Sequence, residues 1–250
     1  MTQPTRLCIL TGHSRGLGAA MAAQRLQPGT HLIGLARRGN VELDALAARR
    51  GAPLEQWAVD LAEPLSAAQR LLEALTAFDP AQFAQAELIN NAGAISDPAA
   101  LRDTPLAAIA TTLRIDLEAT VLLCAAFLDA TRHWRGQRRV LNISSGLGRR
   151  PIASSAVYCA AKAGMDHLSR CLALEEEAQP NGARIVSLAP GVIDTDMQVQ
   201  LRGARDADFP DRGRFVALHR EGQLSSADAA ARRVLACLER EDFGTQPVAD

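Results

Sequence analysis

Aromatic side chains, paired cysteines and excess charge are all scarce in this sequence of 250 residues. Aromatic residues make up 4% of the chain, and Tyr158 is its only tyrosine. The five cysteines are scattered and form no Cys-x-x-Cys pair, which argues against a zinc or redox centre and favours a reduced, cytoplasmic protein. A net charge of −1 excludes strong long-range attraction to nucleic acid or to an anionic membrane surface. These absences favour small-molecule chemistry.

Long apolar runs are missing as well. The first residues, MTQPTRLCILTG, contain too short an apolar run for a signal peptide, and glycine-rich sequence follows at once. The most apolar later run, VLLCAAFL, is bounded by Glu118 and Asp129 and is much shorter than a bilayer requires. The sequence therefore predicts no membrane-spanning segment.

Short apolar runs recur along the chain, and each is followed by a longer segment of helical period. Strands that alternate with helices predict an α/β fold with a doubly wound, mostly parallel sheet and helices on both faces. The sheet is expected to have about seven strands, the last of them an edge strand near Val248. The predicted strands are RLCIL, HLIGLA, LEQWAVD, AELIN, RVLNIS, RIVSLAP and PVA.

Two long helices are indicated by capping residues and period. The first is predicted to begin after Thr104 as N-cap, with Pro105 in its first turn, and to continue to Arg132. The second is predicted from about Ser155 to Ala178, where an acidic run precedes proline and glycine. Since no repeat or flexible linker divides the chain, residues 1–250 are predicted to form one domain.

One segment departs from this regular pattern. Residues 194–222 are rich in charge and weak in helical period. Such a segment is typical of a mobile flap over a binding site.

A glycine-rich turn follows the first predicted strand. The sequence TGHSRGLG contains Gly12, Gly16 and Gly18. Glycine allows a sharp turn from strand to helix and a close approach of the backbone to a pyrophosphate, which the helix N-terminus also favours. The position between strand and helix predicts a dinucleotide-binding turn, and a plain tight turn is the alternative.

Arginines occupy the end of the second predicted strand. Proteins that bind NAD usually carry Asp or Glu there to bind the ribose 2′-hydroxyl. Here Arg37 and Arg38 occupy these positions, and Arg15 lies within the glycine turn. A guanidinium binds phosphate through paired, charge-assisted hydrogen bonds, so the three arginines favour NADP over NAD. Surface arginines without a ligand are the alternative interpretation.

Tyr158 and Lys162 are four residues apart on the second predicted helix and therefore lie on the same face. Lowering a phenol pKa by ~3 units needs about 4 kcal/mol, which a lysine cation and an oxidised nicotinamide together would supply. Tyr158 would then act as an acid or base near neutral pH. Ser145, at the end of the fifth predicted strand, would donate a hydrogen bond to a substrate oxygen. The alternatives are a surface Tyr/Lys pair and an ordinary Ser-Ser turn.

In combination, these motifs resemble the short-chain dehydrogenase/reductase family over nearly the whole chain. TGHSRGLG is similar to the family pattern T-G-x-x-x-G-x-G, and YCAAK to Y-x-x-x-K. NNAG at 90–93 and PGVIDTDMQ at 190–198 are similar to two further family segments, the second of which holds the nicotinamide amide. Ser145 precedes Tyr158 by thirteen residues, the usual spacing of the family serine, and is therefore preferred to Ser144.

The resemblance implies a Rossmann-type fold, NADP(H) as cofactor, and a homodimer or homotetramer formed through the two long helices. It also implies that Asp60 and Leu61 contact adenine and that Asn91 and Ala92 lie along the ribose. Within the family the chain looks closest to the sepiapterin reductase and benzil reductase branch, whose members reduce vicinal or activated carbonyls with NADPH. The expected cofactor-binding residues are Gly12, Ser14, Arg15, Gly16, Leu17, Gly18, Arg37, Arg38, Asp60, Leu61, Asn91, Ala92, Gly93, Tyr158, Lys162, Pro190, Gly191, Ile193 and Thr195.

The chain departs from the family at Asp116, in RIDLEAT, where members carry a catalytic asparagine. If that asparagine acts through its backbone carbonyl, by holding a water that contacts the lysine, aspartate can replace it. If its side-chain amide must donate a hydrogen bond, proton delivery is impaired here. Ser145, Tyr158, Lys162 and Asp116 are thus the expected catalytic residues.

These features predict an NADPH-dependent reductase of ketones or diketones, with Tyr158 as proton donor. One alternative is a catalytically silent NADP-binding protein that reports redox state. Another is an alcohol dehydrogenase, or a reductase of carrier-bound acyl chains that docks on Arg149, Arg150 and Arg202. A hydrophobic substrate is expected because the side chains predicted to face it are mostly apolar, namely Ile95, Leu147, Pro151, Ile152, Met197 and Phe209.

Overall fold

The computed structural model describes residues 5–250, and its centre is a seven-stranded parallel sheet in the order β3-β2-β1-β4-β5-β6-β7. This confirms the predicted doubly wound α/β architecture and all seven predicted strands. The strands are β1 (Arg6–Thr11), β2 (Thr30–Ala36), β3 (Leu54–Ala58), β4 (Gln85–Asn90), β5 (Gln137–Ile143), β6 (Arg184–Leu188) and β7 (Val248–Ala249).

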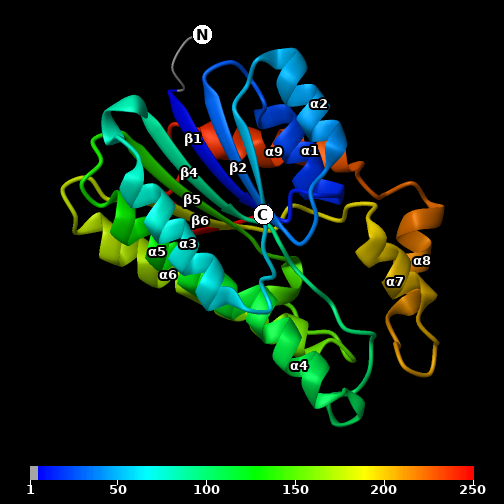
Figure 1. Cartoon of the computed structure of the whole chain (residues 1–250). Coiled ribbons are helices and arrows are strands. Elements are labelled where there is room, and N and C mark those ends of the chain that lie inside the picture. Colours follow the sequence, from blue (N-terminus) through cyan, green and yellow to red (C-terminus); the bar gives the residue numbers. More distant parts are fainter. Residues whose placement is uncertain (1–4) are drawn as a thin grey trace.

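Helices cover both faces of the sheet (Figure 1), with α3, α5 and α6 on one face and α1, α2 and α9 on the other. The α-helices are α1 (Gly16–Arg25), α2 (Val41–Arg50), α3 (Pro64–Ala77), α4 (Leu106–Leu113), α5 (Ala119–Thr131), α6 (Ala156–Glu177), α7 (Asp196–Gly203), α8 (Arg212–Arg220) and α9 (Ala227–Glu239). Among residues 5–250, no helix is long and apolar enough to cross a membrane.

Two hydrophobic cores, one on each face, hold the helices to the sheet. Along β1, Leu7 and Ile9 belong to the core beneath α3 and α5, whereas Cys8 and Leu10 belong to the core beneath α1 and α9. Successive residues of a strand point to opposite faces, so a strand buried on both faces is apolar throughout. This is why the predicted strands are continuous apolar runs.

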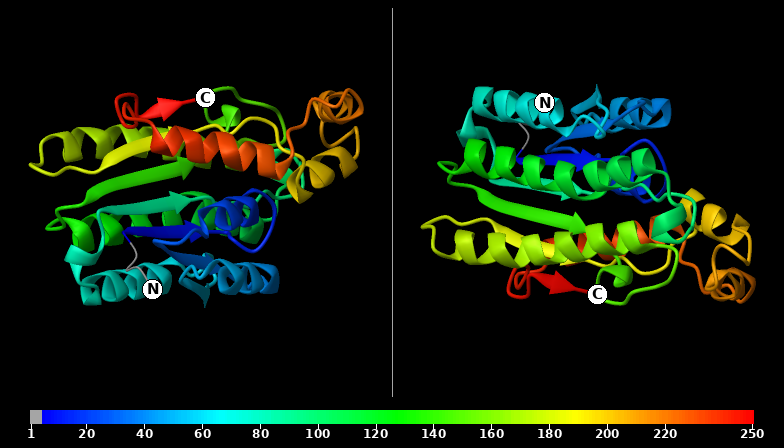
Figure 2. Two further views of the ribbon diagram at one scale, coloured as in Figure 1. Left: turned by 90° about the horizontal axis from the view of Figure 1, so that it is seen from above. Right: turned by 90° about the horizontal axis from the view of Figure 1, so that it is seen from below.

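The strand order reverses between β1 and β4, which pair directly although two strands separate them in sequence. A parallel sheet with such a reversal opens a crevice at the carboxyl ends of its strands. Figure 2 shows the strands directed toward the side of the molecule on which α7 and α8 lie. The fold therefore places the glycine turn, the ends of β4 to β6 and the α7–α8 segment around one crevice.

The long helix predicted from Thr104 differs in two details. The helix begins at Leu106, and Pro105 is at its N-cap position. Thr104 cannot cap it, because Thr104 ends a preceding 3-10 turn at Leu101–Asp103 and its hydroxyl donates to the Ala100 carbonyl at 3.1 Å. A π-helical turn, Arg114–Glu118, divides it into α4 and α5. The second long helix, α6, has the predicted limits, with Ser155 at the N-cap position and Ala178 at the C-cap.

The segment predicted as a flap is helical rather than irregular. Residues 194–222 contain α7 and α8, which contact each other, and Phe209 of the loop between them packs on Phe215 of α8, with ring centroids 5.3 Å apart. Phe209 is completely buried between them. Two helices of eight and nine residues are too short to give a clear period, which explains why the sequence pattern missed them.

Candidate active site

A cleft of about 1710 Å³ lies at the carboxyl ends of the strands. Its walls are the glycine turn, the ends of β2, β4, β5 and β6, the start of α6 and the α7–α8 segment. Every residue predicted to bind the cofactor lines this cleft, and so does Ser145. Asp116 is fully buried and lies outside the lining, behind Lys162.

The glycine turn has the shape that a pyrophosphate needs. Gly12 and Gly16 have φ of +72° and +55°, a region that favours glycine. A Cβ on Gly18 would lie 2.0 Å from the Gly12 carbonyl oxygen, so the turn closes this tightly only with glycine at that position. The backbone at the start of α1 is thereby left open to the cleft, where the helix N-terminus favours a negative charge. The turn therefore fits a dinucleotide.

Asn91 stabilises the glycine turn through hydrogen bonds to Thr11, the last residue of β1. Its side-chain amide donates to the Thr11 carbonyl at 3.0 Å, and its backbone N–H donates to the Thr11 hydroxyl at 2.9 Å. The amide of Asn91 is thus committed to the protein, and it supports the turn rather than pointing freely into the cleft. Thr11, which sequence reasoning left aside, is its partner in this contact.

The three arginines of the predicted phosphate site all line the cleft. Arg37 and Arg38 are exposed at the end of β2 and make no ion pair with any residue of the 5–250 range. Arg15 also projects outward, but its guanidinium forms an ion pair with Asp196 at the start of α7. Arg37 and Arg38 thus reach the cleft from the end of β2, and Arg15 reaches it from the glycine turn.

Tyr158 lies in the cleft wall beside Ser145. Burial and the Asp116 carboxylate raise the phenol pKa well above its ordinary value. A hydrogen bond with the Ser145 side chain opposes this rise but is the smaller effect. The Lys162 ammonium lies 5.6 Å from the centre of the Tyr158 ring. The protein alone thus does not produce the lowered phenol pKa that the sequence predicted, because burial and the Asp116 carboxylate both disfavour the phenolate.

Lys162 is almost fully buried, and its ammonium donates to the Ile143 carbonyl at 3.0 Å. Its nearest carboxylate oxygen, Oδ2 of Asp116, lies 4.0 Å away. Burial lowers the pKa of Lys162 and raises the pKa of Asp116, and the attraction between the two charges opposes both shifts. Lys162 is also the only lysine of the chain, a rarity that would have singled it out in the sequence as Tyr158 was singled out.

The π-helical turn places Asp116 in this centre. Oδ1 of Asp116 accepts a hydrogen bond from the Ala94 N–H at 2.7 Å, whereas Oδ2 accepts none from the described residues. A Cβ on Gly93 would lie 3.7 Å from both Oδ1 of Asp116 and Nζ of Lys162, so Gly93 covers the pair. Extra helical turns of this kind are frequent at functional sites.

Contacts from α7 close one side of the cleft. Besides the pair of Arg15 with Asp196, the side chain of Gln200 donates to Asp97 at 2.8 Å, across from the loop after β4. Ile193 forms an isolated bridge with Ser225, lines the cleft and packs in the core beneath α1 and α9. Asp196 lies within the 190–198 segment, whereas Gln200 is a contact residue that no sequence motif indicated.

The cleft wall beyond Tyr158 is largely apolar. Ile95, Leu147 and Met197 line it as expected, whereas Pro151, Ile152 and Phe209 do not. The α7–α8 segment adds further apolar side chains, and Arg150 is a polar residue of the same cleft. Arg149 and Arg202, expected as parts of a docking patch, are paired with acidic side chains instead. The added side chains are Leu201, Phe215 and Leu218.

Comparison with known proteins gives a consistent result. A family model described as short chain dehydrogenase matches residues 6–206. Benzil reductase ((S)-benzoin forming) of Bacillus cereus is 35% identical over 95% of this chain and 96% of its own length. Sepiapterin reductase of Rattus norvegicus is 33% identical, with 95% of this chain and 92% of its own length covered.

Solved structures agree. The KRED1-Pglu enzyme superposes with a TM-score of 0.81 at 26% identity, covering 98% of this chain and all of its own. A metagenomic short-chain oxidoreductase in complex with NADP gives a TM-score of 0.70 at 25% identity, covering 97% of this chain and 94% of its own.

Proposed function

The chain belongs to the short-chain dehydrogenase/reductase family of oxidoreductases, which act on carbonyl and alcohol groups, and we propose that it is an NADPH-dependent reductase of ketones or diketones. The observation that carries the proposal is the convergence of Ser145, Tyr158 and Lys162 on one wall of a cleft that opens beside a dinucleotide-shaped glycine turn. Benzil and sepiapterin reductases, by name carbonyl-reducing enzymes, are among the relatives.

The residues that would hold NADPH follow the cleft from end to end. The glycine turn would bind the pyrophosphate, Arg37 and Arg38 the 2′-phosphate, and the 190–195 backbone the nicotinamide amide. When bound, the nicotinamide supplies the hydride of the reaction.

The chain's own residues supply the proton. The Ser145 hydroxyl donates a hydrogen bond to the carbonyl oxygen, on which negative charge develops, and Tyr158 transfers its phenolic proton to that oxygen. The high phenol pKa keeps Tyr158 protonated at neutral pH, as a proton donor must be. The buried ammonium of Lys162 stabilises the phenolate that results, and its hydrogen bond to the Ile143 carbonyl fixes its position.

The apolar wall indicates the class of substrate. Leu147 and Met197 flank the reacting side chains, and α7 and α8 contribute Leu201, Phe215 and Leu218. A bulky hydrophobic ketone or aryl diketone would bury its surface here. We expect NADPH oxidation with aryl diketones in a panel that also includes pterins, quinones and acyl thioesters, and activity on acyl thioesters alone would contradict the proposal.

Arg37→Asp tests the cofactor preference. The substitution removes a guanidinium from the proposed 2′-phosphate site and sets a like charge against it. We expect the Kd for NADPH to rise by at least about tenfold, with little change for NADH. An unchanged preference would assign the phosphate to Arg15 and Arg38, or show that there is none.

A second candidate is an NADP-binding protein without turnover. The observation that favours it is the Asp116 carboxylate beside Lys162, which opposes the lowering of the Lys162 pKa by burial and adds to the rise of the Tyr158 pKa that burial causes, and so weakens the lysine as a proton relay. Tight NADPH binding without oxidation by any carbonyl compound of the panel would distinguish it.

We further propose that residues 1–250 act as one cytoplasmic domain that assembles as a dimer or tetramer. The supporting observation is exposed apolar side chains on the two long helices, with Leu106 84%, Val121 38% and Leu174 70% exposed. Light scattering of the purified chain tests this, and a monomer at all concentrations would contradict it.

A further inference from the structure

A buried histidine lies within the glycine turn and belongs to none of the steps above. His13 is 1% exposed, and its Nε2 lies 2.8 Å from Oε1 of Gln56, on the edge strand β3. Its ring occupies the space above Gly34 of β2, where a Cβ would come within 2.5 Å of the imidazole. The chain thus combines a glycine in one strand with a histidine in the turn of another.

The hydrogen bonds of Gln56 define the state of this imidazole. Oε1 of Gln56 also accepts from the Asn40 N–H at 2.7 Å, while Nε2 donates to the Asn40 carbonyl at 3.1 Å and to Asp44 at 2.6 Å. Because Oε1 is an acceptor, Nε2 of His13 carries the proton and donates. Burial lowers the pKa of His13, so the ring is neutral at physiological pH.

Asn40 closes these contacts into a ring. Its side-chain amide donates to the Ser14 carbonyl at 3.1 Å, and its Oδ1 accepts from the Glu42 and Leu43 N–H groups and so caps α2. The path from His13 to Gln56, Asn40 and Ser14 returns to the residue next to His13. This turn clamp, as we call these four residues, joins the glycine turn to the turn after β2.

The two turns joined by the turn clamp carry the candidate phosphate ligands. Arg37 and Arg38 directly precede Gly39 and Asn40, and Arg15 directly follows Ser14. Neither Arg37 nor Arg38 is held by an ion pair with a described residue, so the backbone beneath them determines where they lie. A fixed separation of the two turns reduces the entropy lost when arginines from both converge on one phosphate.

We propose that His13 is a positioning residue that sets the 2′-phosphate site through the turn clamp. The proposal rests on the assignment of Arg37 and Arg38 to the 2′-phosphate. His13 touches neither cofactor nor substrate in this role. It acts on affinity for the phosphorylated cofactor and leaves the chemistry at Tyr158 unchanged.

The test is fluorescence titration of the full chain with NADPH and with NADH. For His13→Ala we expect the NADPH Kd to rise about tenfold, the loss expected for one positioned hydrogen bond, while the NADH Kd changes by less than about threefold. At saturating NADPH, kcat should stay within about twofold of the wild type, since a positioning residue acts on KM. His13→Gln, whose side-chain amide can donate to Gln56, should restore most of the affinity.

The chain supplies a matched control at the other end of the same two strands. His31 of β2 forms a hydrogen bond with Glu55 of β3 at 2.9 Å, so His31→Ala removes a similar contact far from the turns. It should leave both Kd values unchanged. Equal losses for NADPH and NADH in His13→Ala, no rescue by His13→Gln, or the same loss in His31→Ala would each overturn the proposal.

The two proposals fail in different ways. If the wild type binds NADPH no better than NADH, the phosphate assignment is wrong and the positioning role is wrong with it. If the wild type prefers NADPH and His13→Ala keeps that preference, the positioning role alone is wrong.

Discussion

The sheet buries charged side chains at both of its ends, and the two clusters are satisfied very differently. At the amino ends, the fully buried carboxylate of Glu87 lies 3.1 Å from the guanidinium groups of both Arg6 and Arg25. At the carboxyl ends, the buried ammonium of Lys162 has its nearest carboxylate, that of Asp116, 4.0 Å away. In each buried carboxylate one oxygen accepts no hydrogen bond from the described residues, so the two clusters differ in the number and distance of their cations.

This difference separates a structural cluster from a reactive one. Glu87 has two cations and a hydrogen bond from Gln85 at 2.6 Å, so its charge is compensated within the protein. Burial raises the pKa of Glu87 as well as that of Asp116, but Asp116 pairs with one cation at 4.0 Å, and that cation, Lys162, lines the cleft. A buried, weakly compensated charge in a cleft wall is typical of a catalytic site. Substitutions in the first cluster should therefore change stability, and substitutions in the second should change turnover.

The largest effect is expected for Tyr158→Phe. The substitution removes the proposed proton donor and keeps the ring, so NADPH affinity and the free energy of unfolding should remain nearly unchanged. Turnover should fall by the ~10²–10⁴ that general acid catalysis contributes. Steady-state kinetics and NADPH titration measure both quantities. Retention of more than a tenth of the wild-type turnover would remove Tyr158 from the mechanism.

Glu87→Gln should instead lower the free energy of unfolding and leave turnover unchanged. It leaves Arg25 and Arg6 facing a neutral amide, and loss of one partner of a buried ion pair costs about 3 kcal/mol of unfolding free energy. Urea unfolding measures the loss, and turnover of the folded fraction should be unchanged. Glu63→Gln is the control, because Glu63 is exposed and its substitution should have no measurable effect. A loss of turnover without a loss of stability would contradict the contrast between the two ends.

Much of the fold and of the site could be predicted because the signals are local. Apolar runs marked the strands, and the spacing of Tyr158 and Lys162 placed both on one helix face, as α6 shows. The family resemblance placed Asp116 near Lys162, but the π-helical turn at 114–118 that brings the two together has no recognisable sequence signal. The pairs of Arg15 with Asp196 and of His13 with Gln56 join segments distant in sequence, and no motif specifies either pairing.

An ion pair between exposed side chains closes the cleft, and it differs from both buried clusters. Arg15 and Asp196 are 73% and 72% exposed, so their pair is worth at most about 1 kcal/mol. We expect hydrogen exchange across residues 194–222 to slow when NADPH and a substrate analogue bind. Asp196→Asn should speed exchange in α7 of the free protein by no more than about fivefold. Equal exchange with and without ligands would indicate a fixed segment.

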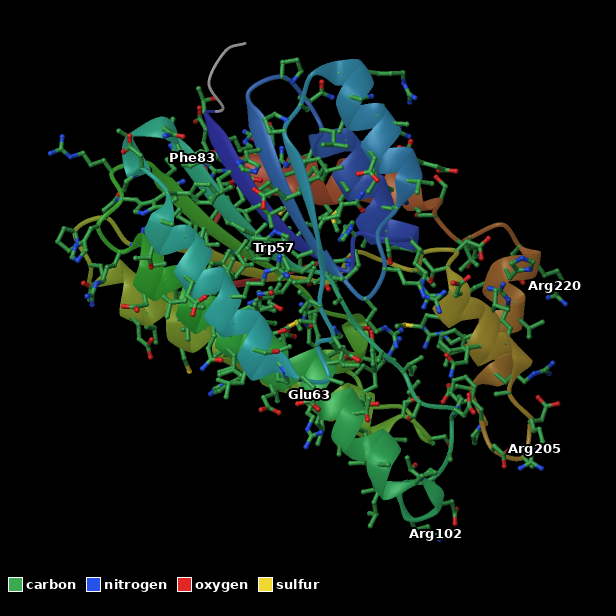
Figure 3. The ribbon with its side chains drawn as sticks, in the orientation of Figure 1. Trp57, Glu63, Phe83, Arg102, Arg205 and Arg220 are labelled. Atoms are coloured by element: carbon green, nitrogen blue, oxygen red, sulfur yellow. The ribbon has the colours of Figure 1, made fainter. Side chains whose placement is uncertain are left out.

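Asp208→Asn is the matched control for that measurement. Asp208 pairs with Arg205, which Figure 3 labels in the loop between α7 and α8, and neither residue is part of the glycine turn. Its loss should leave exchange in α7 unchanged. An equal effect of both substitutions would show that the contact with Arg15 has no special role in closing the cleft.

A change in turnover of less than about tenfold, or ~1.4 kcal/mol, is expected for Asp116→Asn. Asparagine has nearly the same size and keeps the backbone carbonyl, so the shape of the π-helical turn should persist. What changes is the charge beside Lys162. Burial lowers the pKa of Lys162 and raises that of Tyr158. The carboxylate opposes the first shift and adds to the second, so its removal should lower both pKa values.

The sign of the resulting shift can be measured in the pH profile of turnover. Reduction requires protonated Tyr158, so turnover is high below the apparent pKa of this acid and is lost above it. Asp116→Asn should move that basic limb to lower pH, while Glu87→Gln, at the far end of the sheet, should not move it. An unmoved limb would show that Asp116 and Lys162 are not coupled in the working enzyme. A different outcome is that the wild type reduces no carbonyl compound and Asp116→Asn restores reduction. The carboxylate itself would then block proton delivery, and the natural protein would be better described as a cofactor-binding protein without turnover.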